Sequence, residues 1–170
     1  MARSWRLNVG SGLNPKAGYV NADRVRLPRM DIICDFSRRP FPFRNNAFDT
    51  IHMAHVLEHL PDTIGTMEEI YRIAKPLATV IVEVPHYKHS DAFQDPTHVR
   101  FFTEHTFDYF GKDPKSYYSK ARFDIVKVEK VYNWHIAKYI GRPLPRLLPW
   151  IEQFFDNTVK SLTFTLRAVK

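Results

Sequence analysis

Short apolar runs alternate with polar loops along the first half of the chain. Runs of this length that end at glycine, proline or aspartate are typical of buried β-strands. They predict strands at residues 5–9, 18–23, 31–36, 48–54 and 79–85. Because near-continuous apolar strands separated by crossovers occur mainly in parallel sheets, the pattern predicts a mostly parallel sheet.

One helix is expected between the fourth and the fifth of these strands. Asp62 or Thr63 is a suitable N-cap, and Lys75-Pro76 ends the helix near residue 74. Apolar side chains recur there at steps of three and four residues, which places them on one buried helical face. These side chains are Ile64, Met67, Ile70, Tyr71 and Ala74.

The second half of the chain has a different pattern. Residues 123–131 and 162–169 alternate apolar and polar positions, which predicts two strands with one solvated face. Such strands suggest an antiparallel edge on the sheet. Residues 86–122 form the longest irregular region, and a long loop in a compact domain usually carries function. We therefore predict an α/β fold, a Rossmann-like and mostly parallel sheet with an antiparallel edge strand.

Composition narrows the class of protein. The chain has 170 residues, of which 44% are hydrophobic and 25% charged, as expected of a single globular domain. No apolar run reaches the roughly 18 residues of a spanning helix, and the N-terminus lacks the apolar core of a signal peptide, so we expect a cytoplasmic protein. Cys34 is the single cysteine, which excludes an internal disulfide and a cysteine-based zinc site.

The net charge of +7 favours an anionic partner or cofactor, although it serves solubility equally well. Nucleic acid is the least favoured partner, because no basic run is interleaved with aromatics as in RNA-binding modules. Residues 136–155 combine large apolar side chains with Lys138, Arg142 and Arg146. This segment is compatible with a peripheral membrane contact, a homodimer face or simple core packing, and its prolines argue against one long helix.

Polar groups follow the ends of the first three predicted strands. Gly10-Ser11-Gly12 follows the first strand, Asp23 ends the second, and Asp35-Phe36 ends the third. The glycines let the backbone approach a ligand, and a carboxylate after the second strand can hold ribose hydroxyls. Each group alone is explained equally well by a turn or a cap. Three such groups at one sheet edge predict a ligand that lies across the carboxyl ends of the strands.

With these motifs the sequence resembles the class I S-adenosylmethionine-dependent methyltransferases, from about Leu7 to Phe110. The most telling pieces run from Asn46 to Leu60 and from Glu69 to Pro76, and they are similar to the family's fourth strand and to the turn before its fifth. The resemblance implies a class I methyltransferase fold. The first crossover helix is expected to be incomplete, because only ten residues separate Gly12 from Asp23.

The resemblance also implies S-adenosylmethionine as cofactor. The glycine turn would pass under its methionine part, Asp23 would bind the ribose, and Asp35 with Phe36 would meet the adenine. The implied cofactor-binding residues are Val9, Gly10, Ser11, Gly12, Asp23, Asp35, Phe36, Met53 and Ala54. Residues 1–170 then form one domain with a cofactor half (1–85), a substrate loop or lid (86–122), and C-terminal strands with an aromatic-basic segment (123–170).

Two histidines and a glutamate come directly after the fourth strand. Spacings of three and four would place His55, Glu58 and His59 on one helical face, beside the methyl donor. The order resembles the Glu-x-x-Glu-His motif of ubiquinone-biosynthesis and small-RNA 2′-O-methyltransferases, which holds a divalent metal with a further downstream histidine. This implies the metal ligands His55, Glu58, His59 and His98, with zinc, manganese or iron favoured over magnesium. The alternative is that Glu58 and His59 cap the helix.

The loop after the fifth strand is expected to face the acceptor. The candidate catalytic bases are His55, His86 and His98, because an unperturbed imidazole titrates near neutrality. Four aromatic side chains either line an acceptor pocket or pack the loop on the sheet; they are Tyr87, Phe93, Phe101 and Phe102.

The predicted function is transfer of a methyl group from S-adenosylmethionine to a hydroxyl of a small molecule or glycan. The alternative is a non-catalytic subunit that binds the cofactor or a partner, because Leu77-Ala78 stands where the family usually has two glycines.

Overall fold

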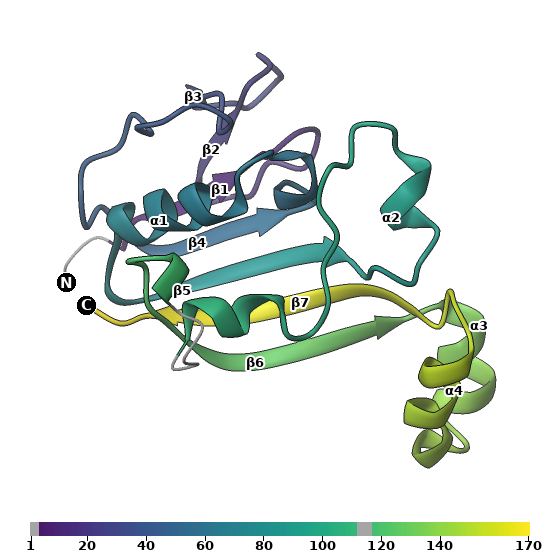
Figure 1. The fold of residues 1–170 in the computed structure, drawn as a ribbon. Helices are drawn as coiled ribbons and strands as arrows, with labels where there is room; N and C mark the ends of the chain where they lie inside the picture. Colours follow the sequence, from purple (N-terminus) through teal and green to yellow (C-terminus); the bar gives the residue numbers. More distant parts are fainter. Residues whose placement is uncertain (1–3, 112–116) are drawn as a thin grey trace.

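The computed structural model describes residues 4–111 and 117–170. Within these residues the chain forms one seven-stranded sheet with the order β3-β2-β1-β4-β5-β7-β6 (Figure 1). The strands are β1 (Arg6–Val9), β2 (Val20–Asp23), β3 (Ile32–Ile33), β4 (Phe48–Ala54), β5 (Ala74–Pro85), β6 (Phe123–Tyr132) and β7 (Val159–Ala168). The pairs among β1 to β5 are parallel, and β7 runs antiparallel to both β5 and β6. The predicted α/β class and the antiparallel edge are confirmed.

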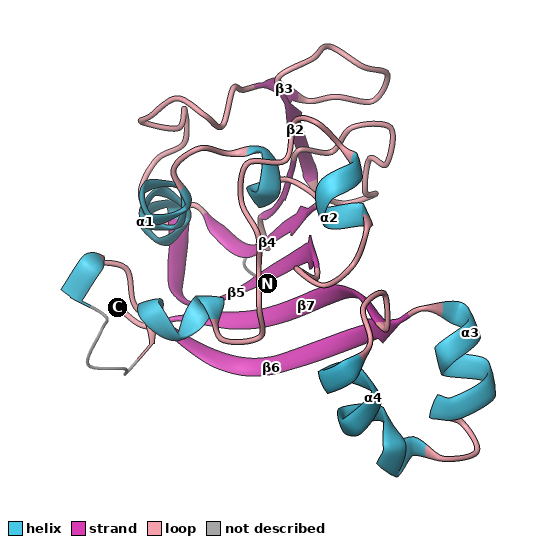
Figure 2. Ribbon diagram, turned by 45° about the vertical axis from the view of Figure 1, so that its right-hand side comes forward, coloured by secondary structure: helices cyan, strands magenta, loops and turns pink. Residues whose placement is uncertain are grey.

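Loops and short helices connect the strands (Figure 2). The longest is α1 (Thr63–Ile73). The others are η1 (Leu57–His59), α2 (Asp91–Gln94), η2 (Thr106–Phe110), α3 (Trp134–Ile136), η4 (Ala137–Gly141), η5 (Pro145–Leu147) and α4 (Leu148–Phe154). No helix in the described part of the chain is long and apolar enough to cross a membrane.

The link between β1 and β2 contains turns and no helix, as the short spacing predicts. Two buried asparagines organise this link in place of a helix. Asn8 Nδ2 donates to Asn21 Oδ1 over 3.0 Å, and the same oxygen accepts from Lys16 N over 2.7 Å. In a crossover helix the backbone N–H and C=O groups would bond to one another. In this link the Asn21 side chain accepts from and donates to the backbone of Lys16 instead.

Helix α1 packs on the sheet through Met67, Ile70 and Ile73, none of which is exposed. Asp62 Oδ1 accepts from Gly65 N over 2.9 Å and is the N-cap. Ile64 departs from the predicted buried face, since it is 40% exposed. The helix ends near residue 74, as predicted, with Ala74 as its C-cap. The fifth strand begins earlier than the predicted residue 79, because Ala74 already takes an extended conformation and starts β5.

The two faces of the sheet are covered differently. Tyr71 of α1 and Phe110 of η2 both contact the Phe123 ring, so α1 and η2 share one face. The opposite face carries partly exposed polar side chains at paired positions of the central strands. They are Thr50, His52, Thr79, Glu83, Thr163 and Thr165. The prediction of near-continuous apolar strands is wrong for β4 and β5, because these strands bury one face and leave the other polar.

The packing of α1 makes a stability prediction. Ile70→Ala should lower the free energy of unfolding by about 2–5 kcal/mol, because it removes a fully buried side chain and leaves a cavity. Ile64→Ala in the same helix is the matched control and should change stability by less than about 1 kcal/mol. Urea denaturation monitored by circular dichroism measures both. Equal losses for the two variants would contradict this account of the core.

Candidate active site

A pocket of about 340 Å³ opens where the carboxyl ends of the parallel strands meet. Five of the predicted cofactor residues line it, namely Gly10, Gly12, Asp23, Asp35 and Phe36. The remaining lining residues are Arg24, Ser37, His55, Val56, His59 and Leu60. The strand-end motifs therefore share one cavity, as a ligand across the sheet edge requires.

The glycine turn after β1 closes tightly on the segment after β4. Gly10 has φ +61°, and a Cβ at this position would lie 2.3 Å from Val56 Cγ2. A side chain at position 10 would therefore collide with Val56, so this position of the turn requires glycine. Gly12 N donates to Asp23 Oδ2 over 2.9 Å, and Val25 N donates to Asp23 Oδ1 over 3.1 Å. These two amides orient the Asp23 carboxylate at the pocket wall.

The third strand end is organised by Asp35 and its neighbours. Ser37 donates to Asp35 Oδ1 from its hydroxyl over 2.6 Å and from its backbone N over 3.0 Å. These hydrogen bonds lower the pKa of Asp35. The Phe36 ring is buried and meets the Phe41 ring edge-on at 5.1 Å. Ser37 and Arg24 were not predicted as site residues, although each directly follows a predicted strand end.

The other predicted cofactor residues do not line the pocket. Val9, Ser11 and Met53 are buried in the body of the domain, and Ala54 is partly buried at the end of β4. Ser11 Oγ donates to Met30 Sδ over 3.3 Å, away from the pocket's lining groups. Val9 and Met53 are paired positions of β1 and β4, so these side chains belong to the sheet beneath the glycine turn and not to the pocket wall.

The segment after β4 differs from the predicted helix. Only Leu57–His59 forms a 3₁₀ turn, and His55 precedes it with φ +54°. His55, Glu58 and His59 therefore do not share one helical face. His55 N donates to Glu83 O over 2.9 Å, which ties this segment to β5. The His55 ring lies with Nδ1 3.2 Å from Glu58 Oε1 and Nε2 3.6 Å from Glu83 Oε1. The hydrogen bond with Glu58 raises the pKa of His55.

Glu58, His59 and His98 come together beside the pocket. One potential ligand atom from each lies within 4.8 Å of those of the other two, and the two imidazole centroids are 4.6 Å apart. Backbone hydrogen bonds produce this convergence, because Glu58 O accepts from Val99 N over 2.8 Å and from Arg100 N over 3.2 Å. The structure does not bring His55 into this group, since its Nδ1 is engaged by Glu58.

The hydrogen bonds of the two imidazoles define their free nitrogens. His98 Nδ1 donates to Ala92 O over 3.1 Å. His59 Nδ1 lies 2.8 Å from Thr97 Oγ1, and that hydroxyl donates its own proton to Asp95 Oδ1 over 2.7 Å. The Thr97 oxygen is therefore the acceptor for His59 Nδ1–H. Neither Nε2 has a hydrogen bond within the described residues, and His98 Nε2 lies 3.9 Å from Asp95 Oδ2.

Glu58 completes the set. Its side chain is almost fully buried at 1% exposure, and Oε1 is engaged by His55. Oε2 is buried and has no hydrogen-bond partner within the described residues. A buried carboxylate oxygen without a donor is costly, so a ligand or ion beside Glu58 accounts for it better than a capping role does.

Of the three candidate bases only His55 lines the strand-end pocket, and neither His86 nor His98 does. His86 is held in a separate buried environment. It is 5% exposed, and burial lowers its pKa. His86 Nε2 is 3.5 Å from Glu104 Oε2, and Lys130 Nζ is 2.6 Å from Glu104 Oε1. Although burial raises the pKa of Glu104, hydrogen bonds from Lys130 and the backbone together lower it to about 2.

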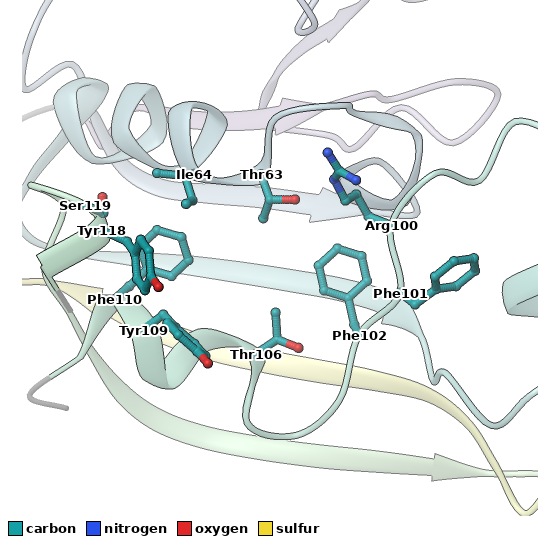
Figure 3. Close-up of a pocket in the computed structure, with 10 residues that line it drawn as sticks. All are labelled: Thr63, Ile64, Arg100, Phe101, Phe102, Thr106, Tyr109, Phe110, Tyr118 and Ser119. Atoms are coloured by element: carbon teal, nitrogen blue, oxygen red, sulfur yellow. The ribbon is translucent and has the colours of Figure 1, made fainter. Parts of the chain in front are cut away.

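A second pocket, of about 200 Å³, lies between the start of α1 and η2 (Figure 3). It is lined by Thr63, Ile64, Arg100, Phe101, Phe102, Thr106, Tyr109, Phe110, Tyr118 and Ser119. Phe102 is 1% exposed and packs the loop on the sheet, whereas Phe101 stacks on Phe93 with centroids 4.6 Å apart. Tyr87, at 39% exposure, lines neither pocket. The loop aromatics therefore do not line the strand-end pocket.

The fold agrees with the comparisons to known proteins. A family model described as a methyltransferase domain matches residues 14–113. The chain therefore belongs to the methyltransferase domain family, and its fold is that of the class I S-adenosylmethionine-dependent methyltransferases.

Among curated proteins, the cycloartenol-C-24-methyltransferase of Arabidopsis thaliana is 39% identical over 74 residues, which cover 41% of this chain. The match spans only 22% of that relative. A solved S-adenosylmethionine-dependent methyltransferase from Archaeoglobus fulgidus aligns with TM-score 0.62 and 13% identity over 96% of this chain and 86% of its own. Phosphoethanolamine N-methyltransferase 2 of Haemonchus contortus, in complex with S-adenosylmethionine, aligns with TM-score 0.61 and 16% identity over 100% and 50%.

The Glu104–Lys130 pair makes a pH prediction. Because folding lowers the pKa of Glu104 from 4.5 to about 2, ionised Glu104 contributes to the free energy of unfolding. This contribution is fully present above pH 4.5 and is lost as the pH falls through about 2. Glu104→Gln should therefore destabilise the protein near neutral pH and flatten the fall of unfolding free energy between about pH 5 and pH 2. Urea denaturation across this range measures the slope.

The control is Glu129→Gln, which removes the partner of Lys127 in an exposed ion pair on β6, the strand that also carries Lys130. It should leave the acid slope close to that of the unmodified protein, because solvent screens exposed pairs. Equal slopes for the unmodified protein and Glu104→Gln would contradict the assignment.

Proposed function

We propose that this protein binds S-adenosylmethionine in the strand-end pocket and transfers its methyl group to a hydroxyl of a small-molecule or glycan acceptor. The observation that carries the proposal is the double position of His59. This residue lines the pocket and also belongs to the Glu58–His59–His98 cluster. A cofactor site and a set of acceptor-binding groups therefore adjoin.

The residues of the pocket fit the cofactor. Gly10 and Gly12 form a backbone cradle, which a Cβ at Gly10 would obstruct by meeting Val56. Asp23, oriented by two amides, suits the ribose hydroxyls, and Phe36 with Ser37 suits the adenine. The cofactor supplies an electrophilic methyl group on a sulfonium, so the protein has mainly to position the acceptor and accept one proton.

We further propose that Glu58, His59 and His98 hold a divalent metal. The support is the buried Glu58 Oε2 without a partner, together with the two hydrogen-bonded imidazoles that keep Nε2 free. Two imidazoles and one carboxylate suit zinc, manganese or iron better than magnesium. A divalent ion held by these residues would lower the pKa of hydroxyls bound to it, and we therefore propose a diol as acceptor.

His55 is the proposed catalytic base. It lines the pocket, and Glu58 Oε1 accepts from its Nδ1–H, so Nε2, which lies 3.6 Å from Glu83 Oε1, is the nitrogen that would accept the acceptor's hydroxyl proton. His98 is assigned to the metal instead, and His86 is buried away from the pocket. Glu58 then serves two neighbours, because Oε1 holds His55 and the carboxylate would also help to hold the metal.

The cofactor assignment predicts the effect of Asp23→Asn. This variant should weaken S-adenosylmethionine binding about ten- to a hundred-fold, because it removes a charged acceptor of ribose hydroxyls. Calorimetric titration measures the change. Asp156→Asn, at an exposed position outside the pocket, is the matched control and should bind as the unmodified protein does.

Normal affinity in Asp23→Asn would remove Asp23 from the ribose site. Absence of any S-adenosylmethionine binding in the unmodified protein would overturn the enzyme assignment and favour a non-catalytic binding subunit.

The metal assignment predicts the effect of Glu58→Gln and His98→Ala. Each variant should weaken manganese or zinc binding at least about ten-fold, because each removes one of three ligands. The measurement is titration of the metal-stripped protein with metal alone, followed by elemental analysis, so that it does not depend on activity. His105→Ala is the control, because this histidine is exposed and lies outside the cluster.

The acceptor class is tested with catechol and phenol as paired probes. Metal-dependent methylation should be found with catechol, should be far weaker with phenol, and should be lost in Glu58→Gln. Equal metal affinity in the unmodified protein, Glu58→Gln, His98→Ala and His105→Ala would overturn the metal assignment. Methylation of both catechol and phenol without metal would support the methyltransferase activity but contradict a diol as the acceptor.

A further inference from the structure

The segment between β6 and β7 forms an arm that the proposed function does not use. This arm, residues 134–155, contains α3, η4, η5 and α4 and projects beyond the end of the sheet in both views (Figures 1 and 2). Its base is closed by Asn133 N, which donates to Thr158 O over 3.0 Å. The arm is therefore an outgrowth of the antiparallel edge, away from the pocket at the ends of β1, β2 and β4.

One side of the arm is attached to the domain. The Tyr132 hydroxyl donates to Glu152 Oε1 over 2.5 Å, and Lys130 pairs with the same carboxylate. Lys88 Nζ donates to Glu152 O and Gln153 O, each over 3.1 Å. These contacts hold α4 in one orientation.

The arm also exposes large apolar side chains. Trp150 and Phe154 lie one turn apart on α4, their rings are 5.0 Å apart, and they are 60% and 62% exposed. Seven large hydrophobic side chains of the arm are between 46% and 62% exposed; they are Trp134, Tyr139, Leu144, Leu147, Trp150, Phe154 and Phe155. Such a concentration on a small projection marks a binding surface.

Charge is arranged around these apolar groups with one sign. The arm has three basic residues, Lys138, Arg142 and Arg146, and all three are exposed. Lys138 Nζ lies over the Trp134 ring at 4.6 Å and over the Tyr139 ring at 5.0 Å. Glu152 is the single acid of the arm, and it is turned toward the domain by Lys130 and Tyr132. The exposed surface therefore carries positive charge alone.

We propose that the arm binds the surface of an anionic lipid membrane. Amphipathic tryptophan and tyrosine rings, aliphatic side chains and peripheral basic residues are the groups that insert at the boundary between lipid head groups and chains. A twofold contact with a second copy would set the same basic residues against themselves, so charge complementarity favours lipid over a dimer. Exposed Leu144, Leu147 and Phe154 provide apolar area that a nucleic-acid phosphate backbone does not cover.

The test is sedimentation of the full chain with vesicles of neutral phosphatidylcholine, with or without about one third anionic phosphatidylglycerol. The chain should bind the anionic vesicles far more strongly. Two of its three tryptophans lie in the arm, so binding should shift tryptophan emission to shorter wavelength. Replacing Lys138, Arg142 and Arg146 by alanine should lower vesicle partitioning about a hundred-fold, at roughly five-fold per basic residue.

Two further variants make the test specific. Alanine at Arg26, Arg44 and Lys120 removes the same number of charges outside the arm and should leave partitioning within about three-fold of the unmodified protein. Trp150→Ser with Phe154→Ser should abolish the emission shift and most of the binding. Circular dichroism melting confirms that each variant is folded.

Absence of binding to anionic vesicles, or equal losses in the two charge variants, would overturn the proposal. Self-association that only the arm variants abolish, measured by sedimentation velocity without lipid, would overturn it in favour of a dimer. None of these measurements uses methyl transfer, so the result is independent of the proposed enzyme activity.

Discussion

The candidate site depends on the burial of one carboxylate, Glu58. Its backbone carbonyl accepts from Val99 and Arg100, which brings His98 from a distant part of the sequence to His59. Its side chain orients His55 through one oxygen and leaves the other oxygen unpartnered. An unpartnered buried acceptor destabilises the fold, and this oxygen belongs to the same cluster as His59 and His98, which is the observation behind the proposed metal site.

The cofactor side achieves its geometry with less structure than a complete class I domain. Side-chain hydrogen bonds from Asn8 and Asn21 replace the first crossover helix, and Gly12 N positions Asp23 directly. The sheet also keeps a polar face at His52 and its paired neighbours, and this face needs no covering helix. Although the link between β1 and β2 is short, residues at the carboxyl ends of all three first strands still line the pocket. They are Gly10 and Gly12 after β1, Asp23 at the end of β2, and Asp35 and Phe36 after β3.

Much of the fold was predictable because strand length and polarity are local properties. The approximate strand positions and the two alternating late strands followed from pattern, and so did the strand-end residues Asp23 and Asp35, whereas the order of the strands in the sheet was not predicted. The conformation of His55 was not predictable, because spacing alone cannot distinguish a helix from a left-handed residue before a short 3₁₀ turn. The convergence of His98 was proposed only by resemblance, since it depends on backbone hydrogen bonds to Glu58 across the fold.

The arm and the loop after β5 are parts of one hydrogen-bonded unit. Lys88 of this loop donates to two carbonyls of α4, and its own carbonyl accepts from Asn157 N over 2.9 Å. Asn157 Oδ1 in turn accepts from Ser90 N over 2.7 Å. A membrane bound by the arm would therefore lie on the side of the domain that carries this loop.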